Sequence, residues 1–221
     1  MIGNLIANAT LYVVPLLLAV TAHEVAHGWV ADKRGDPTAR DLGRITLNPF
    51  AHIDPVGTII LPAILIVFQM QFLFGWAKPV PVRFENLRGG RKDMALVAAS
   101  GPIANLLLAI ASALVYRAVL AGNEMGLAMT NGLFAFVAVP LKSMAVKSVE
   151  LNLVLMTLNL LPVPPLDGGR ILVGVLPESL GAMLEQLERF GLLIVLLLIG
   201  TNAWGYVMHP ILKAFLRFFL Y

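Results

Sequence analysis

The sequence predicts an all-α polytopic membrane protein, a bundle of about four to six transmembrane helices forming a single domain over residues 1–221. Hydrophobic residues make up 58% of the chain and charged residues only 13%, with a mean hydropathy of +0.83. A soluble domain is typically about half apolar and a quarter charged. The Lys and Arg residues also fall between long apolar runs, as in the loops of membrane proteins. A short membrane-associated β element and a re-entrant segment complete the predicted architecture.

The first predicted transmembrane helix covers Ile2–Val30, which is longer than the roughly 20 residues that a membrane helix needs. Its start lacks the basic residues of a signal peptide, so we expect the run to remain in the membrane. Lys33 and Arg34 are the first basic residues and follow it directly. Because cytoplasmic loops are enriched in Lys and Arg, the N-terminus is predicted outside and the other end of this helix in the cytoplasm.

Asp32–Pro55 is a polar loop that contains one strand-like stretch. Gly43–Asn48 alternates between polar and apolar residues, and Asn48-Pro49 and Asp54-Pro55 then interrupt the pattern. We therefore predict a short hairpin or strand near the membrane surface.

Gly57–Gly75 is apolar and just long enough to span a membrane, although it contains Pro62, Gln69 and Gln71. A second basic loop follows it, with Lys78, Arg83, Arg88, Arg91 and Lys92. A single crossing would place the two basic loops on opposite sides of the membrane, against the positive-inside rule. A re-entrant or hairpin segment keeps both loops in the cytoplasm, and protein can bury its non-helical backbone. We therefore favour re-entry, with a single crossing as the alternative.

Met94–Leu120 is the next predicted span, and it carries the pair Gly101-Pro102 and Asn105. Its first half is rich in small residues, which allow neighbouring helices to approach closely. A lone Asn in such a helix commonly hydrogen-bonds to another helix. This interhelical role is the alternative to a place for Asn105 in the site described below.

The second half of the chain contains one further clear span. Leu141–Leu161 is apolar and leads into the turn Pro162–Arg170, where prolines end the helix and glycines let the backbone turn sharply. Gly122–Val139 is mixed and Gly-rich, and the sequence does not assign it. Pro177–Arg189 is charged and predicted cytoplasmic. Phe190–Tyr221 is apolar again, and its interruptions leave open whether it is one kinked span or two short ones.

His23-Glu24-Val25-Ala26-His27 lies inside the first apolar run and predicts a metal site. Two His four residues apart project from the same face of a helix and can bind one zinc ion, while the Glu beside the first can act as general base. Glu24 is the only charged residue from Met1 to Gly28. A carboxylate and two imidazoles at membrane depth are unfavourable unless they pair, bind metal or do chemistry. The alternative is a polar trio hydrogen-bonded to its neighbours.

A third zinc ligand must be found elsewhere, because a catalytic zinc generally takes three protein ligands. The chain contains no Cys, so the ligand is a His or a carboxylate. Lys33 stands ten residues after His23, where one zincin pattern has a third His. The next Glu after Glu24 is Glu85, in a polar loop. His52 is an accessory candidate whose loop can fold back towards the site, with a loop hydrogen bond as the alternative role.

Asp167 is the strongest candidate for this third ligand. It follows an apolar span with no other acid between Leu151 and Leu166, at a helix end broken by Pro and Gly. In the re-entrant topology Asp167 arrives at the cytoplasmic side, level with the His pair, whereas a full crossing at Gly57–Gly75 would put it on the other side. The alternative is a turn Asp paired with Arg170.

Three motifs in this order resemble the site-2 protease family of intramembrane zinc metalloproteases: His23-Glu24-x-x-His27, Gly101-Pro102-x-x-Asn105 and Asn159-x-x-Pro162-x-x-x-Leu166-Asp167-Gly168. The resemblance covers the three spans that carry these motifs and extends to the loops Gly43–Gly57 and Trp76–Val82. The chain resembles a compact prokaryotic-type member without a PDZ or nucleotide-binding domain. Its catalytic core would cover residues 5–170, and a C-terminal helical segment residues 190–221.

The resemblance implies a role for each residue of these motifs. It implies one zinc ion held by His23, His27 and Asp167, with Glu24 as general base. It also implies that Asn159 holds the substrate backbone or stabilises the oxyanion, and that Asn105 lines the same region. Part of Arg40–Pro55 would correspond to the strand with which an unwound substrate pairs.

These observations predict a zinc endopeptidase that cuts within or near transmembrane segments of membrane-anchored proteins, in a prokaryotic-type plasma membrane. A non-proteolytic zinc-binding scaffold and a metal transporter are the alternatives. Retention of Glu24 counts against a scaffold, and the gathering of intramembrane His and acids at one site counts against a transporter. A net charge of only +3, without a basic stripe interleaved with aromatics, argues against nucleic-acid binding. The sequence leaves the substrate and the oligomeric state open.

Overall fold

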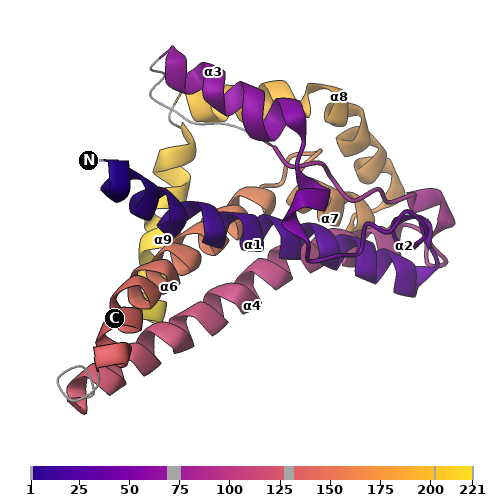
Figure 1. The fold of residues 1–221 in the computed structure, drawn as a ribbon. Helices are drawn as coiled ribbons and strands as arrows, with labels where there is room; N and C mark the ends of the chain where they lie inside the picture. The colour runs from indigo at the N-terminus through magenta and orange to yellow at the C-terminus, as the bar shows by residue number, and fades with distance from the viewer. Residues whose placement is uncertain (1, 69–75, 127–131, 202, 221) are drawn as a thin grey trace.

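The computed structural model describes residues 2–68, 76–126, 132–201 and 203–220, and within these ranges it is built of helices, turns and coil (Figure 1). Three long helices pack together: α1 (Ile2–Arg34), α4 (Arg91–Glu124) and α6 (Gly132–Asn159). The other α-helices are α2 (Thr38–Asp41), α3 (Leu61–Val67), α7 (Asp167–Val175), α8 (Glu178–Gly200) and α9 (Ala203–Leu220). Three short helical turns lie in the loops: η1 (Pro49–His52), η2 (Pro55–Ile60) and η3 (Phe84–Asn86).

Three helices of the described chain are long and apolar enough to cross a membrane: Leu11–Arg34, Arg91–Glu124 and Gly132–Asn159. They coincide with the three spans that carry the sequence motifs, and α6 also takes in the second half of the stretch that the sequence left unassigned. The protein is therefore a helical membrane protein. The total of about four to six spans stays a prediction.

Small residues bring α4 and α6 close together. Ala109 and Ala113 of α4 face Val149 and Leu153 of α6 in one buried apolar cluster. Phe219 of α9 closes this cluster from the C-terminal end of the chain. Alanine at such an interface lets helix backbones approach closely, which is how membrane helices gain packing energy. The alanines of α4 thus fix the pair on which the rest of the bundle is built.

The two ends of the apolar segment 57–75 lie side by side. The Trp76 amide donates to the Gly57 carbonyl at 3.1 Å, and the Thr58 hydroxyl donates to the Trp76 carbonyl at 2.9 Å. Just outside them, the Lys78 amide donates to the His52 carbonyl at 2.9 Å. The chain thus leaves through η2 and α3 and returns to its starting point, while residues 69–75 lie outside the described part. This return supports the predicted hairpin over a single crossing.

The strand predicted at Gly43–Asn48 is not assigned among the described residues, where this stretch is coil. Its polar side chains bond locally: Thr46 Oγ1 accepts from the Asn48 amide at 3.2 Å, and Asn48 Oδ1 accepts from the Phe50 amide at 3.1 Å. Such local bonds compete with the pairing of strands. Arg44 instead ties this coil to the next loop, because its Nη2 donates to the Lys78 carbonyl at 3.0 Å.

A tight turn between α6 and α7 sets where α7 begins. A Cβ at Gly168 would collide with the carbonyl oxygen of Leu160, and one at Gly169 with the backbone nitrogen of Pro164. Only glycine allows the first turn of α7 to lie directly on the backbone that precedes it. Asp167, the first residue of α7, is thereby brought back beside the end of α6.

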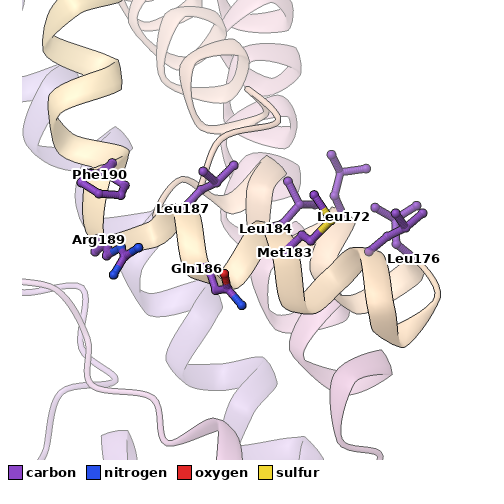
Figure 2. Close-up of a pocket in the computed structure, with 9 residues that line it drawn as sticks. Leu172, Leu176, Met183, Leu184, Gln186, Leu187, Arg189 and Phe190 are labelled. Atoms are coloured by element: carbon purple, nitrogen blue, oxygen red, sulfur yellow. The ribbon is translucent and has the colours of Figure 1, made fainter.

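The charged stretch Pro177–Arg189 and the apolar stretch Phe190–Tyr221 share helices. α8 contains most of the first and the beginning of the second, and α9 follows after a break at Thr201. The described chain therefore has two helices here, not one kinked helix. α7 and the first half of α8 enclose an apolar groove between them, lined by Leu172, Leu176, Met183 and Leu187 among others (Figure 2).

A buried carboxylate joins the two polar loops. Asp36 is fully buried and accepts hydrogen bonds from the Thr38 hydroxyl, from the Arg83 amide at 2.6 Å and from Asn86 Nδ2 at 2.9 Å. Burial alone would raise the pKa of Asp36, but these hydrogen bonds outweigh it and hold the pKa below its usual value. Asp36 therefore stays charged and holds the loop after α1 against the loop before α4.

We expect Asp36→Asn to lower the stability at neutral pH by about 1–3 kcal/mol, because donors that Asp36 satisfies lose a charged acceptor. A lowered folded-state pKa gives stability that is present above the unfolded pKa of about 3.9 and is lost as pH falls through the folded pKa. The difference in thermal unfolding between wild type and variant should therefore hold from pH 7 to 5 and shrink below about 4. Asp41→Asn, at a side chain 63% exposed, is the matched control and should change little. An equal effect of both substitutions would contradict this role for Asp36.

Candidate metal centre

His23, His27 and Asp167 meet at one point inside the protein. The Nε2 atoms of the two imidazoles are 3.0 Å apart, and Asp167 Oδ2 lies 3.2 Å from that of His23 and 3.4 Å from that of His27. Each residue offers one ligand atom, and all three atoms lie within 4.8 Å of one another. The imidazoles come from one face of α1, because four residues make about one helical turn. The carboxylate comes from the first residue of α7.

Hydrogen bonds behind the imidazoles orient both rings towards this point. His23 Nδ1 lies 2.6 Å from Asn105 Oδ1, and His27 Nδ1 lies 2.8 Å from the Val97 carbonyl. Both partners are acceptors, so each Nδ1 carries a proton and each neutral ring keeps a lone pair on Nε2. This second layer of contacts is typical of metal-binding His.

The arrangement favours a cation between the three groups. Two Nε2 lone pairs and a carboxylate oxygen face each other at 3.0 to 3.4 Å, and Asp167 Oδ2 is buried without a hydrogen-bond partner. A buried acceptor cluster with no donor is strongly unfavourable. Two imidazoles and one carboxylate match the ligands of catalytic zinc sites, which keep a further position for water or substrate. The residues present therefore fit a zinc ion.

Gly101 makes room for the imidazoles. A Cβ at this position would collide with His27 Nε2 and come within 2.5 Å of His23 Cε1. α4 can therefore lie against the metal-binding face of α1 only with glycine at this point. The motif Gly101-Pro102-x-x-Asn105 thus combines a close helix approach with the hydrogen bond to His23.

Glu24 is held by the backbone of the second loop. Its Oε2 accepts from the Val80 amide at 2.8 Å. Val80 stands between Pro79 and Pro81, neither of which has an N–H, so this amide is the one donor of the Pro-Val-Pro run. Prolines also hold the residues before them in extended conformations. The run is therefore a rigid extended segment that presents a single donor to the carboxylate.

A pocket of about 420 Å³ opens over these groups. His23, Glu24, His27 and Asp167 line it together with the segment 79–82, Phe84, Asn159 and Arg170. Arg170 does not pair with Asp167 as the turn alternative required. Its Nη2 bonds to Glu188 at 3.0 Å, and its guanidinium lies 5.0 Å from the centre of the Phe84 ring.

The other predicted site residues have distinct places. Asn159 lies in the pocket wall, and its Nδ2 donates to the Leu155 carbonyl at 3.0 Å. Asn105 is fully buried behind His23, outside the residues that line the pocket, so it holds a ligand and does not face a substrate. His52 is buried in its own loop, where its Nε2 lies 2.9 Å from the Thr46 carbonyl, and the metal-binding group does not include it.

Sequence reasoning missed Val80 and Val97, because both contribute backbone atoms. The type of side chain does not indicate whether the backbone amide or carbonyl of a residue contacts the site. Only the sequence Pro79-Val80-Pro81 was a usable signal, since the prolines have no N–H and Val80 therefore carries the one backbone donor. The extended segment at the pocket is accordingly 79–82, in the second loop, and no residue of Arg40–Pro55 is among those that line the pocket.

Comparison with known proteins identifies relatives of this chain. No family model and no solved structure matches the chain. The chain is 40% identical over 203 residues to "Putative zinc metalloprotease YwhC" of Bacillus subtilis, which covers 91% of this chain and 85% of that protein. It is 29% identical over 188 residues to "Putative zinc metalloprotease Rip2" of Mycolicibacterium smegmatis, covering 85% of this chain and 65% of that protein. It is 30% identical over 191 residues to "Putative zinc metalloprotease Rip2" of Mycobacterium tuberculosis, and this match covers 85% of this chain and 67% of that protein.

The YwhC match is extensive enough to decide the family, and the three motifs are those of the site-2 protease type. The chain therefore belongs to the family of zinc metalloproteases that includes YwhC and Rip2, as a compact site-2 protease-like member.

Proposed function

We propose that this protein is an intramembrane zinc endopeptidase that hydrolyses peptide bonds within or near transmembrane segments of membrane-anchored proteins. The observation that carries the proposal is one pocket in which Glu24 stands beside the His23, His27 and Asp167 cluster, whose three ligand atoms are placed to hold a metal ion. His23 and His27 belong to a helix that is long and apolar enough to span a membrane, and Asp167 begins α7, after the turn that follows another such helix. The names of the relatives support the metalloprotease chemistry.

Each polar group of the pocket has a task in peptide hydrolysis. Zinc bound by the three ligands would supply a Lewis acid that polarises the scissile carbonyl and lowers the pKa of a water. Glu24 takes a proton from the attacking water and returns it to the leaving amine. The Val80 amide holds the carboxylate of Glu24 in place for this transfer. Asn159 Nδ2 has two hydrogens and gives one to Leu155, so the other can stabilise the oxyanion, a contact worth roughly 3 kcal/mol.

The substrate must unwind before it is cut, because a helix hides its amides in internal hydrogen bonds. An extended neighbouring segment can offer replacement partners by β-augmentation. The segment 79–82 has this form in the pocket wall, and its prolines suit it to an edge that offers carbonyls and few amides. We therefore assign substrate pairing to this segment, in place of Arg40–Pro55.

We propose that the pocket opens to the cytoplasm and that the N-terminus lies outside, in a prokaryotic-type plasma membrane. The two basic loops lie at the same end of the bundle, since the Arg88 amide donates to the Arg34 carbonyl at 3.0 Å. Arg34 also lies 3.6 Å from Asp93 at the start of α4. This end therefore gathers the positive charge that favours the cytoplasmic side.

A scaffold and a transporter remain the competing functions, and the pocket disfavours both. A scaffold has no use for Glu24 in the wall of an accessible pocket. A transporter needs ligand groups in succession along a path. Among the described residues, His23, His27 and Asp167 form the one group of His and acidic side chains placed to hold a metal ion.

Glu24→Gln should lower the rate of substrate cleavage by about 10²- to 10⁴-fold, because glutamine cannot take the proton of the water. Bound zinc should remain near the wild-type amount, since Glu24 is not a ligand and glutamine can still accept from the Val80 amide. The measurement is cleavage of a membrane-anchored substrate in detergent, with the scissile bond mapped by mass spectrometry and zinc determined on the same samples. Glu124→Gln, at the far end of α4, is the matched control. Cleavage by Glu24→Gln at the wild-type rate would refute the assignment.

Labelling of single cysteines tests the topology without background, because the chain has none of its own. Lys33→Cys, before the apolar segment 57–75, and Lys92→Cys, after it, should both react with an impermeant thiol reagent from the cytoplasmic side, as the hairpin requires. Asn123→Cys, at the opposite end of α4, should react only from outside. Labelling of positions 33 and 92 from opposite sides would exclude the re-entrant segment.

A further inference from the structure

Asn152 lies on α6, outside the residues that line the pocket, yet hydrogen bonds connect it to a metal ligand. We propose that Asn152 is a positioning residue for the metal: it fixes the direction of this hydrogen-bond chain and so keeps His23 in the tautomer that can bind zinc. The inference rests on the metal site proposed above and assigns a new residue to it.

The series of hydrogen bonds begins at a backbone carbonyl of α6. Asn152 Nδ2 donates to the Ser148 carbonyl at 2.8 Å and also lies 3.2 Å from the Ser148 hydroxyl oxygen. A carbonyl oxygen can only accept, so the amide of Asn152 must turn its NH₂ group towards Ser148. Its Oδ1 therefore faces the other way, towards α4, and accepts from Asn105 Nδ2 at 2.9 Å.

The orientation of the Asn152 amide in turn fixes that of Asn105, which bonds to α1. Its Nδ2 has two hydrogens, and both are used: one goes to Asn152 Oδ1, the other to the Ala19 carbonyl at 3.1 Å. The amide of Asn105 thus cannot flip without losing both bonds and placing its own oxygen against two acceptors. Its Oδ1 is left facing His23 Nδ1 at 2.6 Å, where it can only accept.

The last hydrogen bond of this series, between Asn105 and His23, determines which ring nitrogen of His23 is unprotonated. Because Asn105 Oδ1 accepts, the proton of the neutral imidazole sits on Nδ1 and Nε2 keeps its lone pair. Nε2 is the atom that faces His27 and Asp167. A flipped Asn105 would donate to Nδ1, move the proton to Nε2 and block the metal-binding position.

Burial makes this control effective. Asn105 is 0% exposed and Asn152 is 1% exposed, so bulk water does not offer substitute partners to either amide. In such surroundings an amide that lacks a partner is strongly disfavoured. The same hydrogen bonds also join α1, α4 and α6, the three long helices seen together in Figure 1. The tautomer of His23 is thus coupled to the packing of the whole bundle.

The test measures zinc affinity of the full-length protein in detergent by competition with a chelator of known affinity. Asn152→Leu removes the acceptor for Asn105 and should weaken zinc binding by about 10- to 100-fold. Asn152→Asp keeps an oxygen for Asn105 and, when protonated, a hydroxyl for Ser148, so it should restore most of the affinity. Thr157→Val is the matched control, because it removes another buried polar group of α6 whose hydroxyl bonds only to carbonyls of its own helix.

A second measurement determines the tautomer in the wild-type protein and uses a variant only to assign the signal. In the metal-free wild type, the side-chain ¹⁵N spectrum should show His23 protonated at Nδ1, with the signal identified by its loss in His23→Gln. Wild-type affinity in Asn152→Leu, or a wild-type His23 protonated at Nε2, would overturn the role of Asn152 alone. A wild type that binds no zinc would instead overturn the proposed function.

Discussion

Two imidazole nitrogens and a carboxylate oxygen are held within 3.4 Å of one another in the protein interior, and this cluster of acceptor atoms is the constraint around which the rest of the structure is arranged. Without a positive charge among them these acceptors repel each other where water cannot separate them. The bundle nevertheless fixes all three, from α1 and from the first residue of α7. A metal ion bound here would therefore stabilise the fold as well as serve the chemistry, since its binding free energy would add to the folding free energy.

Several features of the fold serve to hold this cluster. Gly101 lets α4 lie against both imidazoles, and Gly168 lets α7 begin directly on the end of α6. Asn105 and the Val97 carbonyl orient the rings from behind. In front, the Pro-Val-Pro segment places one amide on Glu24 and forms a wall of the pocket. The proposed ligands, their orienting groups and the proposed general base thus come from segments far apart in the chain, which would explain why three separate sequence motifs belong to one site.

The sequence was sufficient where side-chain chemistry is unusual for its surroundings. His23, Glu24 and His27 were recognisable as polar groups within one apolar run, and Asp167 as an acid that follows a second apolar run. The hairpin at 57–75 followed from the placement of Lys and Arg on both sides of it, and hydrogen bonds between Gly57 and Trp76 support it. The sequence was insufficient where backbone atoms decide. Gly43–Asn48 alternates as a strand does, but its polar side chains bond to nearby backbone and to the next loop, and Val80 contacts Glu24 through an amide that every residue except proline has. Asn105 was assigned both to interhelical bonding and to the substrate region, and only its burial behind His23 separates the two roles.

The central claim is that an acid from late in the chain completes a metal centre begun by two imidazoles near its start. Zinc-edge X-ray absorption of the purified protein and of Asp167→Ala tests this claim most directly. The account predicts a wild-type zinc shell of two imidazole nitrogens and at least one oxygen at about 2.0–2.2 Å, and predicts a loss of bound zinc or of the carboxylate contribution in the variant. An identical zinc shell and zinc content in both proteins would show that Asp167 is not a ligand and would contradict the account.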